Sequence, residues 1–470
     1  MDVLLNSNLQ SPLLNLLDER AGIESSWTHR IRKGSKTHSI KSVFLKADST
    51  TDGATWSFNL PRYGIATAIY LVMTVEADSV YSSDAVVLHE GNFYGLFKDI
   101  ILSSHAREIE RVTAEVMYVE SLGSIHKKTG SGNGAVTVDG SNESLHKDAG
   151  TGNKYVRAYL KIPFSFFGHY GAQLSNSQNL SFLEQLTVEV RLASKSPGNN
   201  PLFNSAKCKD ESPTSVQATG MNLVISKKTD GHYGREVGPS GLLICYSQFQ
   251  PSVEAHFNKL NYASKSGSGP RSMLQMSTYA ETPVSATVAD EKNNTKMHYI
   301  DVGVSCKSVI VETMLMLRNE NRQPIRNQQF DQFGDLRRIE KVQLWCNGSI
   351  YREWESHKEL LIDNLNVENN SLVSEPQFHA DNNAVRIKYH SKINPLAENS
   401  GCVSFRNTSG TFFRVYYINT DGPDTGAGTA EDPTVEHDWK NKLKLHVHHL
   451  HYTITSIDPN SGSITQSMSI

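Results

Sequence analysis

Closely spaced cysteines are missing from this sequence. Five cysteines are spread along 470 residues, and none belongs to a Cys-x-x-Cys pair. Zinc knuckles and disulfide frameworks depend on such clusters, so the spacing spells out neither kind of small, cross-linked domain. We expect reduced thiols in a protein that stays inside the cell that makes it. The cysteines are Cys208, Cys245, Cys306, Cys346 and Cys402.

Long apolar runs and an excess of one charge are missing as well. No stretch reaches the roughly 18 apolar residues that a membrane-spanning helix needs. Asp2 stands where a secretory signal carries basic residues, and no small-residue cleavage site follows, so we expect no signal peptide. The formal net charge of −3 argues against a surface built to neutralise nucleic-acid phosphates.

The sequence also lacks signatures of catalysis. It has no Gly-x-Ser-x-Gly elbow and no His-Glu-x-x-His zinc motif. The Gly-rich stretch at 129–135 does not end in the Gly-Lys-Ser/Thr of a phosphate-binding loop. Glu184 and Glu189 are an odd number of positions apart, which puts them on opposite faces of a strand and disfavours a glycosidase pair. We therefore predict that the protein is not an enzyme and needs no cofactor.

Alternating apolar and polar residues dominate what is present. This period of two predicts β-strands, whereas long helical periodicity is scarce. Because 470 residues exceed the size at which one hydrophobic core usually stops growing, we expect two β domains. The clearest alternating stretches are 55–61, 68–77, 183–192 and 442–454.

Two polar stretches interrupt the strand pattern. Residues 126–154 are too long for a hairpin and too polar for a core, so we expect an exposed loop that projects outward. Residues 193–215 follow a strong strand, and strand patterning resumes near Asn222, which places the domain boundary at 215. The expected division is an N-terminal arm at 1–40, a first domain at 41–215 and a second domain at 216–470.

The N-terminal arm combines a short helix with basic residues. Ser11 can cap this helix and Pro12 suits its first position, and four leucines follow on one face. Such an arm is commonly a solvated terminus packed under its own domain, and the alternative is an anchor to a neighbouring subunit, a membrane or nucleic acid. The interaction candidates are Leu13, Leu14, Leu16, Leu17, Arg30, Arg32, Lys33 and Lys36.

One hairpin pattern occurs twice. Residues 336–354, LRRIEKVQLWCNGSIYREW, predict a strand, a tight turn at Asn347 and Gly348, and a second strand. Residues 96–112, LFKDIILSSHAREIERV, carry a weaker version of the same pattern. A repeated device of this kind indicates a duplicated domain.

An alignment of the two hairpins brings their apolar positions into phase. Ile100 aligns with Val342 and, after a gap of one residue, Ile109 aligns with Ile350. Two domains with the same order of strands predict two similar β-sandwiches in tandem. The strands that we expect to close the two domains are 183–192 and 443–454.

Four histidines gather in the stretch HVHHLH at 446–451. On a strand, His446 and His448 share one face while His449 and His451 share the other, so at most two of them can ligate one ion. Polar histidines at an interface are the simplest interpretation. A pH-sensitive contact and a metal site completed by other residues are the alternatives.

Several motifs, taken in order, resemble one family: the double jelly-roll major capsid proteins of non-tailed icosahedral DNA viruses. The capsid proteins of nucleocytoplasmic large DNA viruses and polinton-like viruses are the most similar members. Five segments carry the resemblance. They are a strand–turn–strand segment, a stretch that begins with proline and aromatic residues (IPFSFF), the Asn347–Gly348 hairpin, the segment INPLAENSGCVSF and a closing strand. These motifs occupy residues 91–117, 162–192, 342–361, 393–405 and 451–464.

The resemblance implies an all-β fold of two tandem eight-stranded jelly rolls, with short helices in loops and at the N-terminus. It further implies a homotrimer with a pseudo-six-fold outline that tiles an icosahedral shell, beside neighbouring capsomers and penton and minor or cement proteins. The arm would lie under the shell, where contact with an inner membrane is one option. The expected location is the virion, after synthesis in the host interior, without sequence-specific binding of nucleic acid.

One rival function starts from the same β-sandwich fold. A carbohydrate-binding or receptor-attachment protein would use exposed aromatic rings as platforms for sugars, and 9% of the residues are aromatic. Trp345, Trp354 and Trp439 are the candidates for this role. A β-sandwich hydrolase is a weaker alternative that would require converging carboxylates.

Overall fold

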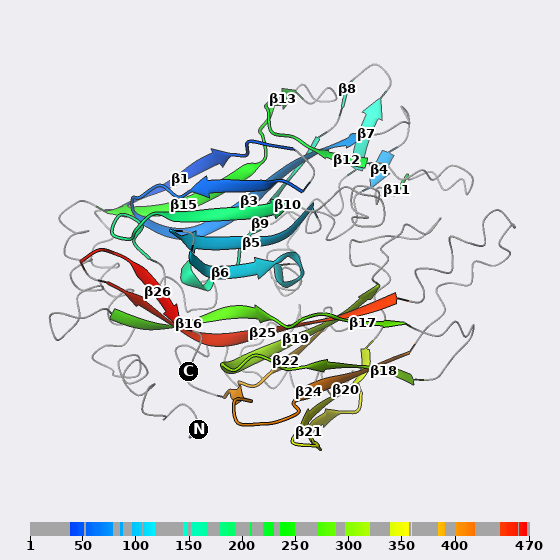
Figure 1. Ribbon diagram of the computed structural model, residues 1–470. Coiled ribbons are helices and arrows are strands. Elements are labelled where there is room, and N and C mark those ends of the chain that lie inside the picture. Colours follow the sequence, from blue (N-terminus) through cyan, green and yellow to red (C-terminus); the bar gives the residue numbers. More distant parts are fainter. Residues whose placement is uncertain are drawn as a thin grey trace, which may run out of the picture.

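The computed structural model is an all-β chain, shown in Figure 1. Helical structure in the described part is limited to short pieces, the longest being residues 114–117 and the 3-10 turn η4 (Ser165–Phe167). No helix there is long and apolar enough to cross a membrane. The described residues are 38–50, 53–78, 85–87, 96–105, 107–117, 144–148, 152–153, 155–167, 178–192, 207–208, 220–229, 236–249, 271–287, 297–319, 339–356, 359, 384–390, 401–418, 442–458 and 460–467.

The first barrel consists of two antiparallel sheets. In one sheet β15 lies between β1 and β3, and both β9 and β12 pair with β3; the other sheet has the order β2-β10-β5-β6. The first sheet is formed by β1 (His38–Lys46), β3 (Ile65–Asp78), β9 (Tyr155–Lys161), β12 (Gly220–Leu223) and β15 (Gly241–Phe249). The second sheet is formed by β2 (Thr55–Asn59), β5 (Phe97–Ser104), β6 (Arg107–Thr113) and β10 (Leu186–Leu192).

The second barrel repeats this arrangement. One sheet has the order β16-β25-β19-β22, with β17 and β26 also paired to β25 and β23 paired to β19; the other has the order β18-β24-β20-β21. The first of these sheets contains β16 (Arg271–Ala280), β17 (Val284–Thr287), β19 (Val309–Asn319), β22 (Ala384–Lys388), β23 (Val403–Ser404), β25 (Lys442–Ile457) and β26 (Ile464–Ser467). The second contains β18 (Met297–Gly303), β20 (Ile339–Cys346), β21 (Ser349–Trp354) and β24 (Phe412–Ile418).

Each barrel buries the inward face of its strands in a core of its own. Burial alternates along β10 and along β18, because successive side chains on a strand point to opposite faces. Trp56 and Phe58 are among the large side chains of the first core, and Trp354 and Phe413 are among those of the second. The two barrels are therefore separate sandwiches, each with the two-sheet order of an eight-stranded jelly roll.

Irregularities in strand pairing fall at matching points of the two barrels. The pairing of β5 with β6 shifts between Leu102 and Ser103, and the pairing of β20 with β21 shifts between Leu344 and Trp345. Bulges disrupt a ladder locally and are retained as features of a fold, so their coincidence is a sign of duplication. Two further register shifts recur in both barrels. The shift between β10 and β5 corresponds to the shift between β24 and β20. The shift between β15 and β3 corresponds to the shift between β25 and β19.

The register corrects the expected alignment of the two hairpins. Ser104 pairs with Arg107 and Cys346 pairs with Ser349, so both turns contain the same number of residues and no gap is needed. The sequence alignment placed a one-residue gap between the hairpins, but each hairpin has a bulge with one extra residue at the same point. As a result, Ile109 corresponds to Tyr351 and Arg111 to Glu353, one position beyond the expected match.

Strand pairing also revises the expected equivalences and boundary. β10 lies inside its sheet beside β2 and β5, so its counterpart is β24, and the counterpart of β25 is β15. Both β12 and β15 pair with β3 although they lie beyond residue 215. Strands of the first barrel therefore follow the polar stretch at 193–215 in the sequence, so this stretch does not mark the end of the first barrel. We infer that the boundary lies between Phe249 and Arg271.

Long connections of the first barrel contribute to a small extra sheet of order β11-β4-β7-β8. β7 and β8 come from the polar stretch at 126–154, which was expected to be a loop. Figure 1 shows these strands together at one end of the first barrel. They are β4 (Ala85–Val87), β7 (Ser144–Asp148), β8 (Gly152–Asn153) and β11 (Lys207–Cys208), and a separate short pair is β13 (Lys228–Thr229) with β14 (Glu236–Val237).

Candidate interaction surfaces

The predicted interaction residues of the N-terminal arm lie outside the described residues. Those residues are Leu13, Leu14, Leu16, Leu17, Arg30, Arg32, Lys33 and Lys36.

Asn347 and Gly348 form the turn between β20 and β21, with φ values of 52° and 77°. These angles suit a tight hairpin turn, which needs a left-handed backbone at both central residues. The turn is also tied to the rest of the barrel, because Oδ1 of Asn347 accepts a hydrogen bond from the amide of Ser409 at 2.8 Å.

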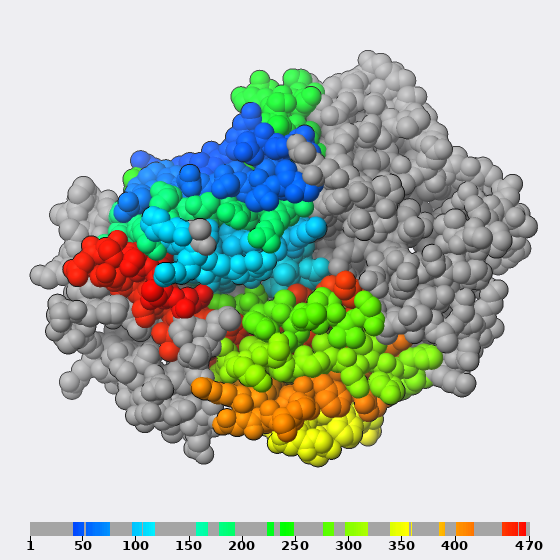
Figure 2. Space-filling model, viewed as in Figure 1, coloured from blue at the N-terminus to red at the C-terminus, as the bar shows by residue number. Residues whose placement is uncertain are grey.

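The two barrels meet at a seam on the outer face of the β16–β25–β19–β22 sheet. Met314 and Met316 lie on this face, and both pack with the core cluster of the first barrel. Met314 is 2% exposed, and His448 opposite it on β25 is buried too. In Figure 2 the red C-terminal strands lie directly against the cyan strands of the first barrel. Apolar burial of this kind makes the barrels one unit.

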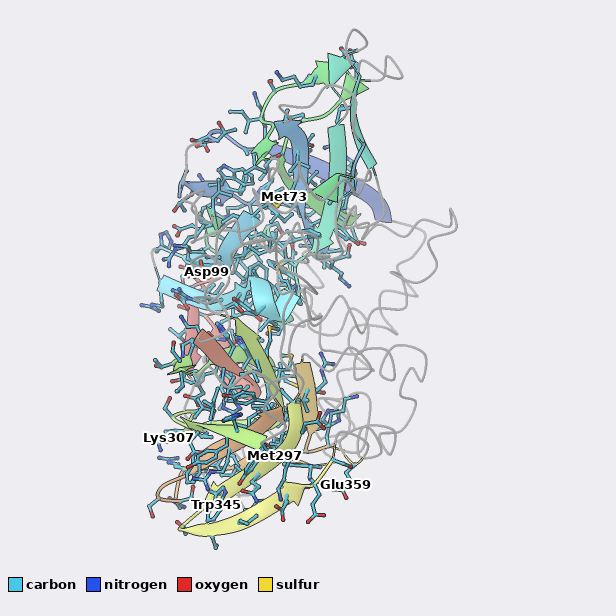
Figure 3. The ribbon with its side chains drawn as sticks, turned by 90° about the vertical axis from the view of Figure 1, so that its right-hand side faces the viewer. Met73, Asp99, Met297, Lys307, Trp345 and Glu359 are labelled. Carbon is cyan, nitrogen blue, oxygen red and sulfur yellow. The ribbon has the colours of Figure 1, made fainter. Side chains whose placement is uncertain are left out.

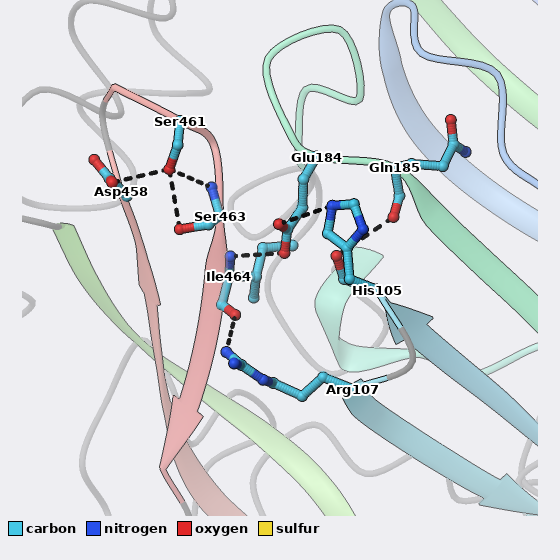
Figure 4. Close-up of polar contacts among 9 residues, drawn as sticks. His105, Arg107, Glu184, Gln185, Asp458, Ser461, Ser463 and Ile464 are labelled. Atoms are coloured by element: carbon cyan, nitrogen blue, oxygen red, sulfur yellow. Dashed lines mark hydrogen bonds and ion pairs between the residues drawn. The ribbon is translucent and has the colours of Figure 1, made fainter.

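Polar contacts line one end of the seam, as Figure 4 shows. The Arg107 guanidinium donates to the carbonyl of Ile464 at 3.2 Å, and the amide of Ile464 donates to Glu184 Oε1 at 3.0 Å. The amide of Glu184 in turn donates to the carbonyl of Gly462 at 3.1 Å. His105 Nε2 lies 3.4 Å from Glu184 Oε2. The strand β26 is thus held against the β5–β6 turn.

A second polar contact joins the edges of the two barrels. β6 lies beside β16, and Oγ1 of Thr278 on β16 donates a hydrogen bond to the carbonyl of Arg111 on β6 at 2.8 Å. β6 and β16 are both edge strands of their sheets. An edge strand offers unpaired backbone groups, and this contact covers one of them.

The histidine stretch on β25 is buried on both faces. His446 and His448 lie on the seam side with their rings stacked at 6.4 Å, whereas His449 lies against the second core beside Phe413. The structure therefore separates the four side chains by face, as the alternation predicts. Among the described residues, no group of three or more His, Cys, Asp or Glu side chains is arranged to hold a metal ion.

His449 belongs to a buried polar cluster of the second barrel. Its Nε2 lies 3.2 Å from Glu281 Oε1, and its Nδ1 lies 2.9 Å from Thr313 Oγ1. The amides of Ser305 and Cys306 donate to the same carboxylate at 2.7 and 3.0 Å. Burial alone would raise the pKa of Glu281, but these hydrogen bonds outweigh it and lower the pKa to about 2. The carboxylate is an ionised structural anchor.

Glu312 is a second buried carboxylate, on the seam side of β19. His390 Nε2 lies 2.7 Å from its Oε1, and the Arg386 guanidinium lies 3.6 Å from its Oε2. Burial would raise its pKa, yet Arg386, His390 and Lys388 lower it to about 2. Both oxygens of Glu312 thus contact residues of β22 or of the segment that follows it, which ties this part of the chain to β19.

Glu110 on β6 is a buried acid whose pKa is raised to about 7. Its carboxylate accepts hydrogen bonds from the amides of Ser165 and Phe166 at 2.9 and 3.1 Å, at the start of η4. Burial raises the pKa of Glu110 from an ordinary value near 4.5 to about 7, although the two amides oppose the shift. Because η4 also lies beside β16, this acid supports the seam from within the first barrel.

The outer face of the β18–β24–β20–β21 sheet carries stacked rings and cations. Trp345 stacks on Phe412 with centroids 5.7 Å apart, and the Arg414 guanidinium lies 4.5 Å from the Tyr299 ring and also over Trp345. Arg414 is held by Asp301 through hydrogen bonds of 2.8 and 2.7 Å. Figure 3 shows Trp345 at the lower end of the molecule.

Exposed large apolar side chains in the described part all lie on this sheet. They fall into two groups, one on β18 and one on β21, at its opposite edges. Ile350 and Tyr351 on β21 are 43% and 63% exposed. The other two are Met297 and Tyr299. The corresponding face of the first barrel is polar, with Thr55 and Ser57 in place of Tyr299 and Asp301.

Two of the candidate sugar platforms do not fit that role. Trp354 is buried in the second core, and Trp345 already stacks on Phe412 and beneath Arg414. Trp439 lies outside the described residues. The surface residues that sequence reasoning missed are Ile350, Tyr351 and the seam methionines; only the alternation of the strands could have indicated that these side chains point away from the core.

Comparisons with known proteins identify the fold. No protein-family model matches the sequence, and no curated protein matches it. Solved structures match along nearly the whole chain, with TM-scores of 0.57 for VP54 of the virus PBCV-1, fitted into a reconstruction of the virophage Sputnik, and 0.56 for a chain of the PBCV-1 virus capsid. Identities are 12% and 11%, and each match covers 92% of this chain and 96% of the other.

A third match has the same character. A chain of the Sputnik virophage gives a TM-score of 0.50 with 12% identity, over 92% of this chain and 89% of that one. At identities this low, the matches establish similarity of fold and nothing further. The chain therefore has the double jelly-roll fold of these viral capsid structures, as the sequence motifs had implied.

Proposed function

We propose that this chain is the major capsid protein of a non-tailed icosahedral DNA virus. The observation that carries the proposal is the presence of two matched jelly rolls in one chain, with an architecture similar over 92% of its length to a chain of the PBCV-1 virus capsid. A fold alone does not determine function, so the surfaces also enter the argument. The buried polar clusters of the described residues serve packing, which fits a structural protein better than an enzyme.

The assembly unit in this proposal is a homotrimer with a pseudo-six-fold outline. Two similar barrels per chain supply six similar units to a ring of three chains. The end of the first barrel that carries β4, β7, β8 and β11 would face outward, because the polar composition of 126–154 favours contact with water. Burial of this end between capsomers would contradict that orientation.

The partners follow from the same proposal. Trimers would contact neighbouring trimers, and penton and minor or cement proteins would fill the remaining positions of the shell. The arm at 1–40 would lie on the inner side, where its leucines and basic residues suit an anionic surface such as a membrane. The protein would be made in the host interior and reside in the virion. No observed feature favours the carbohydrate-binding alternative.

The test is the mass of the purified full-length protein in solution by light scattering, with negative-stain images of the same sample. We expect a particle of three chains with a hexagonal outline. A protein that remains a monomer or dimer at all salt and protein concentrations, with no such outline, would overturn the proposal.

A further inference from the structure

The surfaces that join the two barrels within the chain have equivalents elsewhere in the molecule that no barrel of the same chain covers. At the seam, the edge strand β6 of the first barrel lies beside β16 of the second, and the outer face of the β16–β25–β19–β22 sheet is buried. The strands that correspond to these are β21 in the second barrel and β1, β15 and β3 in the first. The chain therefore presents a second copy of each contact surface, without a second barrel of its own to cover it.

Strand registers identify the equivalent residues. The matching bulges place Ser42 at the position of Thr278, Tyr70 at that of Met314, Leu243 at that of His448 and Cys245 at that of Leu450. We call the outward-pointing residues Ser42, Phe44, Tyr70, Leu243 and Cys245 the receiving face. Phe44, Leu243 and Tyr70 lie side by side on it across three neighbouring strands.

Burial differs sharply between the two sets of positions. Met314, His448 and Leu450 are buried at the seam. Their counterparts Tyr70, Leu243 and Cys245 are only partly buried, and Ser42 is exposed. A partly exposed apolar face on a central part of a sheet is the kind of surface that marks a protein contact.

The edge that would cover this face is exposed as well. Ile109 on β6 is 4% exposed, whereas Tyr351 at the same position of β21 is 63% exposed. Beside β6, the Arg107 guanidinium reaches the β26 backbone, so that hairpin is already covered by the other barrel. The β21 hairpin therefore exposes an apolar side chain at a position whose counterpart in the first barrel is buried.

The two unused surfaces lie at opposite ends of the molecule. In Figure 1, β1, β15 and β3 lie at the top and β21 at the bottom, and in Figure 2 the blue and yellow segments are correspondingly far apart. One chain cannot join them. A head-to-tail contact between copies can, and contacts of this type close into a ring when the rotation allows.

We propose that the β21 hairpin of one chain binds the receiving face of a second copy, in the arrangement that β6 makes with β16 within the chain. Tyr351 and Ile350 pack against Phe44, Leu243 and Tyr70, and the Ser42 hydroxyl donates to the carbonyl of Glu353, as Thr278 does to that of Arg111. The inference rests on the proposed trimer and specifies which surfaces form it.

Cross-linking of paired cysteines tests the geometry. The double variant Ser42→Cys with Glu353→Cys is treated with a short bismaleimide and analysed on a denaturing gel. We expect covalent dimers and trimers, since the two positions belong to different chains at the contact. The matched control is Ser42→Cys with Gly303→Cys, because Gly303 is exposed with open space around it on β18, at the other edge of the same sheet. Each single variant reports the background from native thiols.

A substitution tests the energetics. Tyr351→Asp introduces a charge at the centre of the contact, and we expect the trimer dissociation midpoint by light scattering to shift by about tenfold or more in concentration. Met297→Asp, at an exposed position on β18, is the control and should leave the midpoint unchanged. Circular dichroism of each variant checks that the barrels remain folded.

The outcomes separate this inference from the proposed function. A trimer that forms without the Ser42–Glu353 cross-link, or that is unaffected by Tyr351→Asp, overturns the contact and leaves the capsid proposal standing. A wild-type protein that stays monomeric overturns both. A cross-linked trimer together with the Tyr351→Asp effect supports both.

Discussion

The amide of Ile464 and the carboxylate of Glu184 are joined by a hydrogen bond of 3.0 Å across 280 positions of the chain. Glu184 precedes a strand of the first barrel, and Ile464 begins β26 of the second. This bond and its neighbours fix the angle between the barrels at one end of the seam. In a capsid subunit, that angle would decide whether three chains close into a ring.

Gly462 makes the closest approach at this point, and replacing it is expected to weaken the seam. Its φ is 68°, and a Cβ there would lie 2.3 Å from the carbonyl oxygen of Phe182. Gly462→Ala therefore adds a steric clash to the backbone strain of about 1–2 kcal/mol expected for a left-handed alanine. Gly53→Ala is the matched control, because Gly53 has a φ of 67° and open space around it.

Urea denaturation of the two variants measures the difference. We expect Gly462→Ala to be the more destabilised protein by at least about 1 kcal/mol. Equal losses in the two variants would show that the backbone at Gly462 moves away from Phe182 without cost.

Glu110 is expected to make stability fall as the pH rises. Its pKa is raised to about 7 in the folded protein, from an ordinary value near 4.5, so the folded state retains a proton that the unfolded state loses in this window. The contribution is fully present below pH 4.5 and is lost as the pH rises toward 7 and above, by at most about 3 kcal/mol.

The measurement compares the free energy of unfolding of wild type and Glu110→Gln between pH 4.5 and 8. The difference between the two proteins should shrink with rising pH, because the glutamine does not titrate. Glu189→Gln, on the outer side of β10, should follow the wild-type profile. A wild-type-to-glutamine difference that is constant with pH would contradict the raised pKa.

His451 is expected to have the opposite effect on the acid side. Burial lowers its pKa to about 4 from an ordinary value near 6.5, and the nearby His449 adds to this shift. The unfolded state therefore takes up a proton that the folded state resists, and stability is lost as the pH falls from 6.5 to 4, by at most about 3 kcal/mol.

A His451→Gln variant should lack this acid-dependent loss, although it starts from a lower stability because the Nδ1 contact with the carbonyl of Tyr452 changes. The control is His298→Gln, at a partly exposed position where the ring stacks on Tyr417. If wild type and His451→Gln lose stability in parallel below pH 6.5, His451 is not the titrating group.

Much of the fold was predictable because the signals are local. Alternation placed β2, β3, β10 and β25, and the Asn-Gly pair placed the turn between β20 and β21. The boundary at 215 and the expected equivalence of strands 183–192 and 443–454 were wrong, because both depend on which strands pair with each other. A polar insertion before β15 looks the same in sequence as a linker, and only the pairing of β15 with β1 and β3 distinguishes the two.

The surfaces were less predictable than the fold. Alternation along a strand indicates which side chains point into the core, such as Val342, and which point away from it. It does not reveal which outer face a second barrel covers. His448 and Met314 are buried because the first barrel packs over them, and no pattern within β19 or β25 carries that information. The same limit explains why the buried state of Glu110 was not foreseen.

The turn residue Asn347 offers a final prediction that separates two causes of stability. Its φ of 52° strains any residue with a Cβ other than asparagine or aspartate, and its Oδ1 accepts a hydrogen bond from Ser409. Asn347→Ala loses both features, and we expect a cost of about 2 kcal/mol. Asn347→Gly relieves the strain and loses only the hydrogen bond, so its cost should be about 1 kcal/mol.

Asn347→Asp keeps an acceptor oxygen and tolerates the left-handed backbone, so it should remain within about 0.5 kcal/mol of wild type. Urea denaturation of the three variants gives the order. If glycine proved as costly as alanine, the hydrogen bond to Ser409 would carry the whole effect and backbone strain at the turn would contribute nothing. Since the same hairpin carries Tyr351, the aspartate variant should also retain the proposed trimer contact, whereas a turn that loses its shape would weaken that contact.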